Sequence, residues 1–212
     1  MENCLKVFSL NCQSLQGKIS HIREDKIVMR SDIICLSETW LLSDENHENL
    51  QIEGFSLQAN GVGRGKGLAT YFKRDIFQHC KDIKEQYFQI SKLTSQSLDV
   101  ISIYRSKESK VNALLKEIEQ MIQWDQTTLI CGDFNICYIS DRNNKLLSAL
   151  VYLGFAQLVQ EATHIKGGLI DHVYIRDGRK IAKADCSLYS PYYCAMDHDA
   201  LLTTINICTD KP

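Results

Sequence analysis

Short apolar segments of β-strand length recur along the whole chain, and most of them end at a polar residue. Residues 5–10 alternate between apolar and polar positions, whereas 32–36 and 127–131 are largely apolar, as in strands that are buried on both faces. Further strand-like segments are residues 55–58, 68–72, 87–93, 100–104, 169–175, 184–189 and 200–207. The pattern therefore predicts a domain that is rich in β-sheet.

Three segments between these strands show helical spacing instead. Residues 14–29 and 111–124 carry apolar side chains three to five positions apart, and a third helix is expected from Asp141, as its N-cap, to Tyr152. Strands with a few interleaved helices indicate an α/β fold of four layers, in which two mixed β-sheets pack face to face and helices flank them. Because the chain has no repeat, low-complexity stretch or Pro-rich linker, we expect residues 1–212 to form a single domain.

Composition excludes several classes of protein. With 44% apolar and 24% charged residues, the chain has the balance of a globular protein rather than a disordered one. No apolar run reaches membrane-spanning length. Residues 1–10 lack the charged segment followed by an apolar segment that is typical of a secretory signal. The number of cysteines, nine, is odd, which argues against a disulfide scaffold and favours an intracellular protein. No Cys-x-x-Cys pair occurs, which argues against a structural zinc site. A net charge of −2 is low for a sequence-blind DNA binder, although it allows an enzyme with a basic face and an acidic pocket.

The polar residues at the strand ends are the candidates for chemistry. They are Asn11, Glu38, Tyr104, Asp133, Asn135, Asp171, Asp197 and His198. Each one alone fits a turn, a cap or a surface position. A carboxylate directly after a buried strand costs free energy unless it is paired or binds a metal. As a set, several acids, two amides and a histidine therefore indicate hydrolysis of a phosphodiester with a divalent metal ion.

These residues lie in motifs that resemble those of the endonuclease/exonuclease/phosphatase superfamily. The motifs are Ser9-Leu10-Asn11 with Gln13-Ser14-Leu15, Ser37-Glu38-Thr39-Trp40-Leu41, Ile103-Tyr104-Arg105, Gly132-Asp133-Phe134-Asn135, Ala162-Thr163-His164 with Ile170-Asp171-His172-Val173, and Met196-Asp197-His198. They follow the family order from end to end and imply a DNase I-like fold. The amino-acid sequences of these motifs are most similar to those of the apurinic-endonuclease-like domains of LINE-type (non-LTR) retrotransposons and related mobile elements.

The resemblance also implies residue roles in a Mg²⁺-dependent endonuclease, with Mn²⁺ as the alternative ion. Glu38 and Asn11 would hold the metal, with Asp197 supporting the metal side. Asp133 and Asn135 would hold the attacking water, His198 would donate to the phosphate, Asp171 would orient His198, and Tyr104 would lie near the leaving oxygen. Thr163 and Arg105 would bind DNA. Both Asp133 and His198 remain candidates for the general base.

The same resemblance implies partners and a place of action. The partner would be DNA, which the enzyme nicks at the target site of a mobile element, and no membrane partner is expected. The domain would be a monomer in isolation, would be fused to a reverse transcriptase or other mobile-element domains in a longer protein, and would act in the nucleus.

Two positions depart from the family pattern. Met196 stands where the last motif usually begins with Ser, and Gln13 stands where repair enzymes often carry a carboxylate. The second departure weakens a dedicated apurinic repair role. The alternatives are a repair nuclease, an RNA or phospholipid/phosphoinositide hydrolase of the same superfamily, or a catalytically inactive nucleic-acid-binding module. The retained acids and histidine argue against the inactive module.

A Gly-rich segment at residues 61–67 invites comparison with a phosphate-binding loop. It lacks the required spacing, no Ser or Thr follows Lys66, and the next segment is a strand rather than a helix. We therefore expect a hairpin turn whose Arg64 and Lys66 contact a backbone phosphate.

Overall fold

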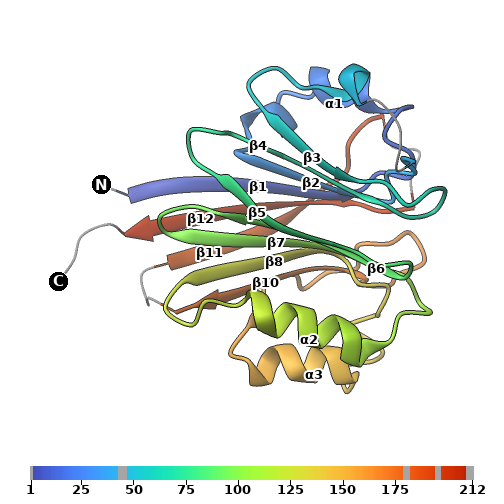
Figure 1. Cartoon of the computed structure of the whole chain (residues 1–212). Coiled ribbons are helices and arrows are strands. Elements are labelled where there is room, and N and C mark those ends of the chain that lie inside the picture. The colour runs from blue at the N-terminus through green and yellow to red at the C-terminus, as the bar shows by residue number, and fades with distance from the viewer. Residues whose placement is uncertain (1, 43–46, 179–181, 194–196, 209–212) are drawn as a thin grey trace.

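Two mixed six-stranded β-sheets form the centre of the computed structural model, which describes residues 2–42, 47–178, 182–193 and 197–208 (Figure 1). The first sheet has the order β11 (Ala182–Tyr189), β12 (Ala200–Cys208), β1 (Glu2–Asn11), β2 (Ile33–Ser37), β4 (Leu68–Phe72) and β3 (Ser56–Asn60). The second has the order β5 (Gln78–Lys84), β6 (Phe88–Thr94), β7 (Leu98–Arg105), β8 (Thr127–Asp133), β10 (Asp171–Asp177) and β9 (Ala156–Gln157). Neighbouring strands pair antiparallel, except that β1 is parallel to β2 and β7 to β8.

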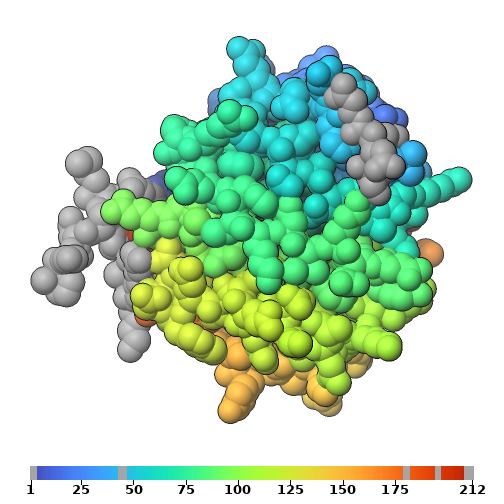
Figure 2. Space-filling view, in the orientation of Figure 1, coloured from blue at the N-terminus to red at the C-terminus, as the bar shows by residue number. Residues whose placement is uncertain are grey.

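Helices cover the outer faces of both sheets, which confirms the predicted four-layer α/β sandwich. The helices α2 (Val111–Met121) and α3 (Lys145–Tyr152) lie on the second sheet, and α1 (Ile19–Glu24) lies on the first together with the short 3₁₀ helices η1 (Val28–Arg30) and η2 (Glu48–Leu50) (Figure 1). In Figure 2 the side chains of these layers form one continuous surface on the face that is in view.

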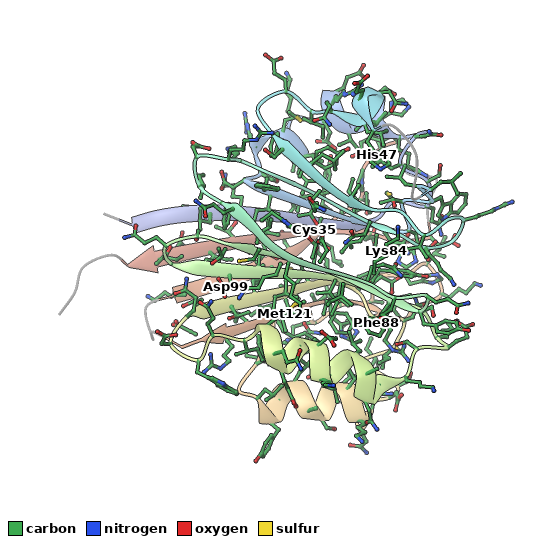
Figure 3. All side chains as sticks on the ribbon, viewed as in Figure 1. Cys35, His47, Lys84, Phe88, Asp99 and Met121 are labelled. Carbon is green, nitrogen blue, oxygen red and sulfur yellow. The ribbon has the colours of Figure 1, made fainter. Side chains whose placement is uncertain are left out.

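Three apolar clusters hold the layers together. Val7, Ile33 and Cys35 of the first sheet meet Leu129 and Cys131 of the second, and Figure 3 shows Cys35 between the two sheets. The other two clusters join α2 and α3 to the second sheet and α1, η1 and η2 to the first. The strands with continuous apolar runs are therefore buried on both faces. One face contributes to the cluster between the two sheets, and the other face lies under a helix.

The first helix is shorter than the prediction for residues 14–29. Gln13 and Ser14 adopt positive φ angles of 40° and 85°, and the Ser14 N–H donates to the carbonyl of Glu38 at 2.9 Å. At the other end, the Asp25 carboxylate accepts hydrogen bonds from the N–H groups of residues 27 and 28 and so begins a separate turn. Tertiary contacts of the backbone at both ends thus limit a segment whose side-chain spacing alone favours a longer helix.

The structure differs from the sequence-based expectation in two further places. The third helix begins at Lys145 with the side chain of Asn144 as its N-cap, whereas Asp141 accepts a hydrogen bond from the Asn144 amide. The sequence also gave no signal for the edge strand β5, because most of its side chains are exposed and its apolar positions do not alternate.

Candidate active site

The register of three neighbouring strands sets three of the predicted residues side by side. Tyr104 at the end of β7 pairs with Asp133 at the end of β8, and Asp133 pairs with Asp171 at the start of β10. On the first sheet, Asn11 at the end of β1 pairs with Ser37, which directly precedes Glu38. These ends lie at the side of the sandwich opposite the N-terminus, on the right in Figure 1.

Asn11 connects the two halves of this site. Its Nδ2 donates to Oδ2 of Asp133 at 2.9 Å and lies 3.4 Å from Nε2 of His198. Asn135 holds the same carboxylate, since its backbone N–H donates to Oδ1 at 2.8 Å and its amide Nδ2 lies 3.2 Å from Oδ2. The Asp133 carboxylate, which is fully buried, is therefore fixed from both sheets by neutral amide donors.

His198 and Asp171 form a buried hydrogen-bonded pair. Nδ1 of His198 lies 2.7 Å from Oδ2 of Asp171, and the hydroxyl of Thr163 donates to the same oxygen at 2.8 Å. Thr163 in turn accepts the backbone N–H of Asp171 at 3.1 Å. Because this bond fixes Nδ1 of the imidazole ring, Nε2 is directed to the side on which Asn11 and Asp133 lie.

The charges at this site shift two pKa values in ways that suit acid–base chemistry. Burial raises the pKa of Asp133 to about 8, and the nearby charge of Asp171 adds to the effect. Burial alone would lower the pKa of His198, but its hydrogen bond to Asp171 and the negative charge of the nearby carboxylates raise it to about 9. Around neutral pH the metal-free site therefore holds a protonated imidazole next to a carboxyl that can take up or release a proton.

The backbone directly before Asp133 can be formed only with a glycine at position 132. Its φ is 136°, and a Cβ there would lie 1.9 Å from the carbonyl oxygen of Ile103. Any side chain would push β7 and β8 apart at the point where they present Tyr104 and Asp133.

Glu38 follows β2 in a left-handed backbone conformation, with φ of 50°, and its side chain is half-buried. Its negative charge acts on Tyr104, Asp133 and His198, as their pKa shifts show. Glu38 is thus near enough to influence these groups, although it does not belong to the group of carboxylate and imidazole atoms within 4.8 Å of one another that Asp133, Asp171 and His198 form.

Tyr104 links the site to the Gly-rich loop of residues 61–67. Its hydroxyl donates to the carbonyl of Gly65 at 2.7 Å, and burial and the nearby carboxylates raise its pKa, so the phenol stays protonated. The loop thus lies beside Tyr104, with Arg64 exposed and Lys66 half-buried.

Comparison with known proteins agrees with this geometry. Residues 8–193 match the Endonuclease/Exonuclease/phosphatase family. The chain belongs to the endonuclease/exonuclease/phosphatase family. Its site is accordingly that of a hydrolase that acts on phosphodiester bonds, in a family that generally depends on divalent metal ions. No curated protein sequence matches the chain significantly.

Solved structures with this fold include several nucleases. An AP endonuclease from Archaeoglobus fulgidus superimposes with a TM-score of 0.74 at 15% identity, over 94% of this chain and 98% of that one. The endonuclease domain of TRAS1, a telomere-specific non-LTR retrotransposon, gives a TM-score of 0.70 at 12% identity, over 99% and 100% of the two chains. The 3′ phosphatase NExo from Neisseria, bound to a product DNA hairpin, gives 0.69 at 18% identity, over 94% and 98%. The likeness to all three extends over nearly the whole fold.

The donor set of this family member fits a hard divalent cation. Asp133, Asp171 and His198 offer ligand atoms that all lie within 4.8 Å of one another. A protonated His198 has no free lone pair, so its position among these atoms suits a donor to an anion better than a metal ligand. Carboxylate oxygens, including that of the nearby Glu38, are the ligands that Mg²⁺ and Mn²⁺ prefer.

Two residues expected to bind DNA have internal partners instead. The Thr163 side chain is fully buried, and its hydroxyl is used by Asp171. Arg105 is also buried, and its guanidinium donates to the carbonyls of Phe134, Lys107 and Ser109 at 3.0, 3.4 and 3.4 Å. The physical reason is the same for both: the loops that carry Asp133 and Asp171 need buried donors for their backbone and side-chain oxygens.

The remaining members of the last motif lie at the edge of the site. Asp197 is exposed and does not belong to the group of carboxylate and imidazole atoms within 4.8 Å. Met196, the departure from the family pattern, falls outside the described residues.

Sequence reasoning missed two histidines that support the site. His172 is buried, stacks on Phe134 with ring centroids 4.8 Å apart, and its Nε2 lies 2.9 Å from the carbonyl of Ile136. His164 meets His198 edge to face, with ring centroids 4.8 Å apart. Both stand next to a predicted residue in the sequence, but their spacing gave no sign that they pack against the catalytic loops.

Finally, no helix among the described residues is long and apolar enough to cross a membrane.

Proposed function

We propose that this chain is a Mg²⁺-dependent endonuclease that nicks DNA, and that it makes the target-site nick of a mobile element. The observation that supports this proposal most is the arrangement of Asp133 beside the His198–Asp171 pair, at the ends of strands from both sheets. A carboxyl that can accept a proton and an imidazolium that can donate to an anion lie on either side of one small space.

In this proposal Glu38 and Asn11 would hold the metal ion, and Asp197 would support the metal side of the site. The bound ion would supply positive charge against the charge that develops on the scissile phosphate. Of the two candidates for the general base, Asp133 would take the proton of the attacking water, because the hydrogen bond to Asp171 holds His198 in its protonated form. Asn135 keeps this carboxylate in place through its backbone N–H and amide.

His198 acts in the proposal as the donor to the phosphate. Its protonated ring would donate from Nε2, because Nδ1 is taken by Asp171. Tyr104 lies on the side of Asp133 that faces away from Asp171 in the sheet. As a protonated phenol it would contact the phosphate or the leaving oxygen. Arg64 and Lys66 would then contact the DNA backbone.

The proposed partner is DNA, and the proposed context is a single, monomeric domain within a longer mobile-element protein that acts in the nucleus. The similarity in fold to the TRAS1 endonuclease domain and to NExo bound to a DNA hairpin supports this context. The amino-acid sequences of the motifs between Asn11 and His198 support the same context independently.

Supercoiled plasmid is the substrate that tests the proposal. We expect the protein to convert it to the nicked circle with Mg²⁺ but not with EDTA, because the carboxylates need the ion to bind the phosphate. Glu38→Ala should abolish nicking while the circular dichroism spectrum and the unfolding midpoint stay close to those of the wild type.

Glu53→Ala provides the matched control, since Glu53 is an exposed glutamate outside the site. It should nick at the wild-type rate. Abasic duplex and RNA tested side by side distinguish the alternative substrates. Wild-type nicking by Glu38→Ala, or RNA cleavage without any DNA cleavage, would refute the proposal.

A further inference from the structure

Two aromatic–cation pairs flank the Gly-rich loop next to the candidate active site. The guanidinium carbon of Arg64 lies 5.4 Å from the ring centroid of Trp40. The ammonium nitrogen of Lys66 lies 5.2 Å from the ring centroid of Tyr87. Gly65, between the two cations, accepts the hydrogen bond of Tyr104. We call these two contacts the aromatic–cation pairs.

Backbone contacts fix the Trp40 pair at the rim of the site. Trp40 comes two residues after Glu38, and its N–H donates to the carbonyl of Lys66 at 2.9 Å. Its φ of 58° is unusual for a bulky side chain. Strained backbone of this kind persists where the surrounding structure holds it, often at sites of function.

The Tyr87 pair lies at the same rim of the site, where backbone contacts with the second sheet hold it. The carbonyl of Tyr87 accepts the N–H of Ser106, which directly follows β7, at 2.8 Å. Two residues further on, Gln89 pairs with Tyr104 in the register, and its Oε1 accepts the N–H of Gly67 at 3.1 Å. Each aromatic ring is thus held beside a residue of the proposed catalytic set.

The exposure of these groups leaves them accessible. Arg64 is exposed, the Tyr87 side chain is 39% exposed, and Trp40 and Lys66 are half-buried. Aromatic faces next to cations are the combination that binds single-stranded nucleic acid, because bases stack on the rings while the cations meet the phosphates.

We propose that the two aromatic–cation pairs bind an unpaired nucleotide of the DNA beside the scissile phosphate, an inference that rests on the proposed nuclease function. In a duplex the faces of a base are covered by its stacked neighbours, so an aromatic ring can stack only on a base that has left the stack. The pairs therefore select DNA that is single-stranded, frayed or easily unstacked at the nick site.

The chain offers a matched control for this site. It contains two tryptophans, and Trp124 also carries an arginine on its face, with the guanidinium carbon of Arg176 4.6 Å from the ring centroid. Trp124 is 58% exposed and lies just before β8, at the end of that strand opposite Asp133. A contact that merely stabilises a loop would behave in the same way at both positions.

Tryptophan fluorescence tests the proposal, and the variant that reports on Trp40 leaves the site itself unchanged. In Trp124→Phe the remaining reporter is Trp40, and in Trp40→Phe it is Trp124. With EDTA present to prevent metal-assisted hydrolysis, oligothymidylate should quench Trp40 and leave Trp124 unchanged. Binding of a labelled oligothymidylate, followed by anisotropy, without any quenching of Trp40 would overturn the proposal.

Affinity measurements provide the second test. Trp40→Leu should bind single-stranded DNA about tenfold more weakly, while its affinity for a blunt duplex changes little. Trp40→Phe, which keeps an aromatic face, should retain most of the single-strand affinity, and Trp124→Leu should match the wild type. Equal losses on single strand and duplex would overturn the proposal, because they indicate a contact to the backbone.

Plasmid nicking by the wild type separates this inference from the proposed function. If the wild type nicks plasmid with Mg²⁺ but Trp40 does not respond to single-stranded DNA, the inference alone fails. If Trp40 responds as expected but no nicking occurs, the proposed function fails and the nucleotide site stands.

Discussion

At the scale of single residues, unusual backbone conformations concentrate around the site. Among the described residues, the non-glycine positions with positive φ are Gln13, Ser14, Glu38, Trp40 and Asn135. All of them follow strands that end at the site, and each such conformation costs about 1–3 kcal/mol. Strong local hydrogen bonds offset this cost, as at Asn135, whose N–H donates to Asp133. The geometry of the site is therefore held by its own polar contacts.

The His198–Asp171 pair gives a prediction at this scale. In the metal-free protein, Asp171→Asn should lower the pKa of His198 from about 9 toward its ordinary value, because the hydrogen-bonded negative charge is lost. NMR titration of the imidazole with EDTA present measures this directly, and the other histidine signals serve as references. An unchanged pKa in the variant would remove the pair from the mechanism.

At the scale of secondary-structure elements, a buried ion pair joins β6, β7 and α2. Lys92 of β6 lies 2.7 Å from the carboxylate of Asp99 on β7, and its ammonium also donates to the carbonyl of Met121 at 2.8 Å. Asp99, labelled with Met121 in Figure 3, stands near the start of β7, at the end of that strand away from Tyr104. The positive charge at the C-terminus of α2 also suits the helix dipole.

Breaking this pair should destabilise the fold strongly. Asp99→Asn leaves the ammonium of Lys92 buried without a counter-charge, so we expect a loss of about 3–5 kcal/mol in the free energy of unfolding. The double variant Lys92→Met with Asp99→Leu should lose much less, because neither charge remains. Urea unfolding measures both.

A matched control for the ion pair lies on the same helix. Lys81 and Glu117 form an ion pair of 3.5 Å, and the Lys81 side chain is 44% exposed. Because solvent screens this pair, Glu117→Gln should cost at most about 1 kcal/mol. Similar losses for Asp99→Asn and Glu117→Gln would contradict the assignment of a special role to the buried pair.

At the scale of the whole molecule, two histidines make the stability of the metal-free protein depend on pH in opposite directions. Burial lowers the pKa of His172 to about 4, so the unfolded chain binds a proton more readily than the folded one. Stability is therefore lost as the pH falls from about 6.5 toward 4. The raised pKa of His198 acts in the other direction, and its contribution is lost as the pH rises through about 9.

The His172 contribution can be measured on its own. A shift of this size corresponds to about 3 kcal/mol when fully developed, since one pKa unit is about 1.4 kcal/mol. We expect the wild type to lose stability between pH 7 and pH 5, and His172→Gln to lose clearly less over the same range, in urea unfolding with EDTA present. Identical pH dependence in the two proteins would contradict the prediction.

The hydrophobic pattern determined the layers of the fold, and the strand-end motifs determined the family. Continuous apolar runs such as residues 32–36 and 127–131 indicate strands that are buried on both faces, and in the structure they lie in the clusters between the sheets and under the helices. The Gly132-Asp133-Phe134-Asn135 motif was readable through its resemblance to the family, and the structure adds the reason for its glycine, which the backbone of Ile103 requires.

Only the tertiary structure decided which of the candidate polar residues are used in internal contacts that hold the site together. Thr163 and Arg105 have the polar chemistry of DNA ligands, yet both are buried because the catalytic loops need internal donors. Trp40 and His164 both stand within the family motifs, but their contacts with Arg64 and His198 could not be predicted, since these partners lie far away in the sequence. Spacing along a chain reports contacts within one element, whereas these contacts arise where the ends of two sheets are brought together.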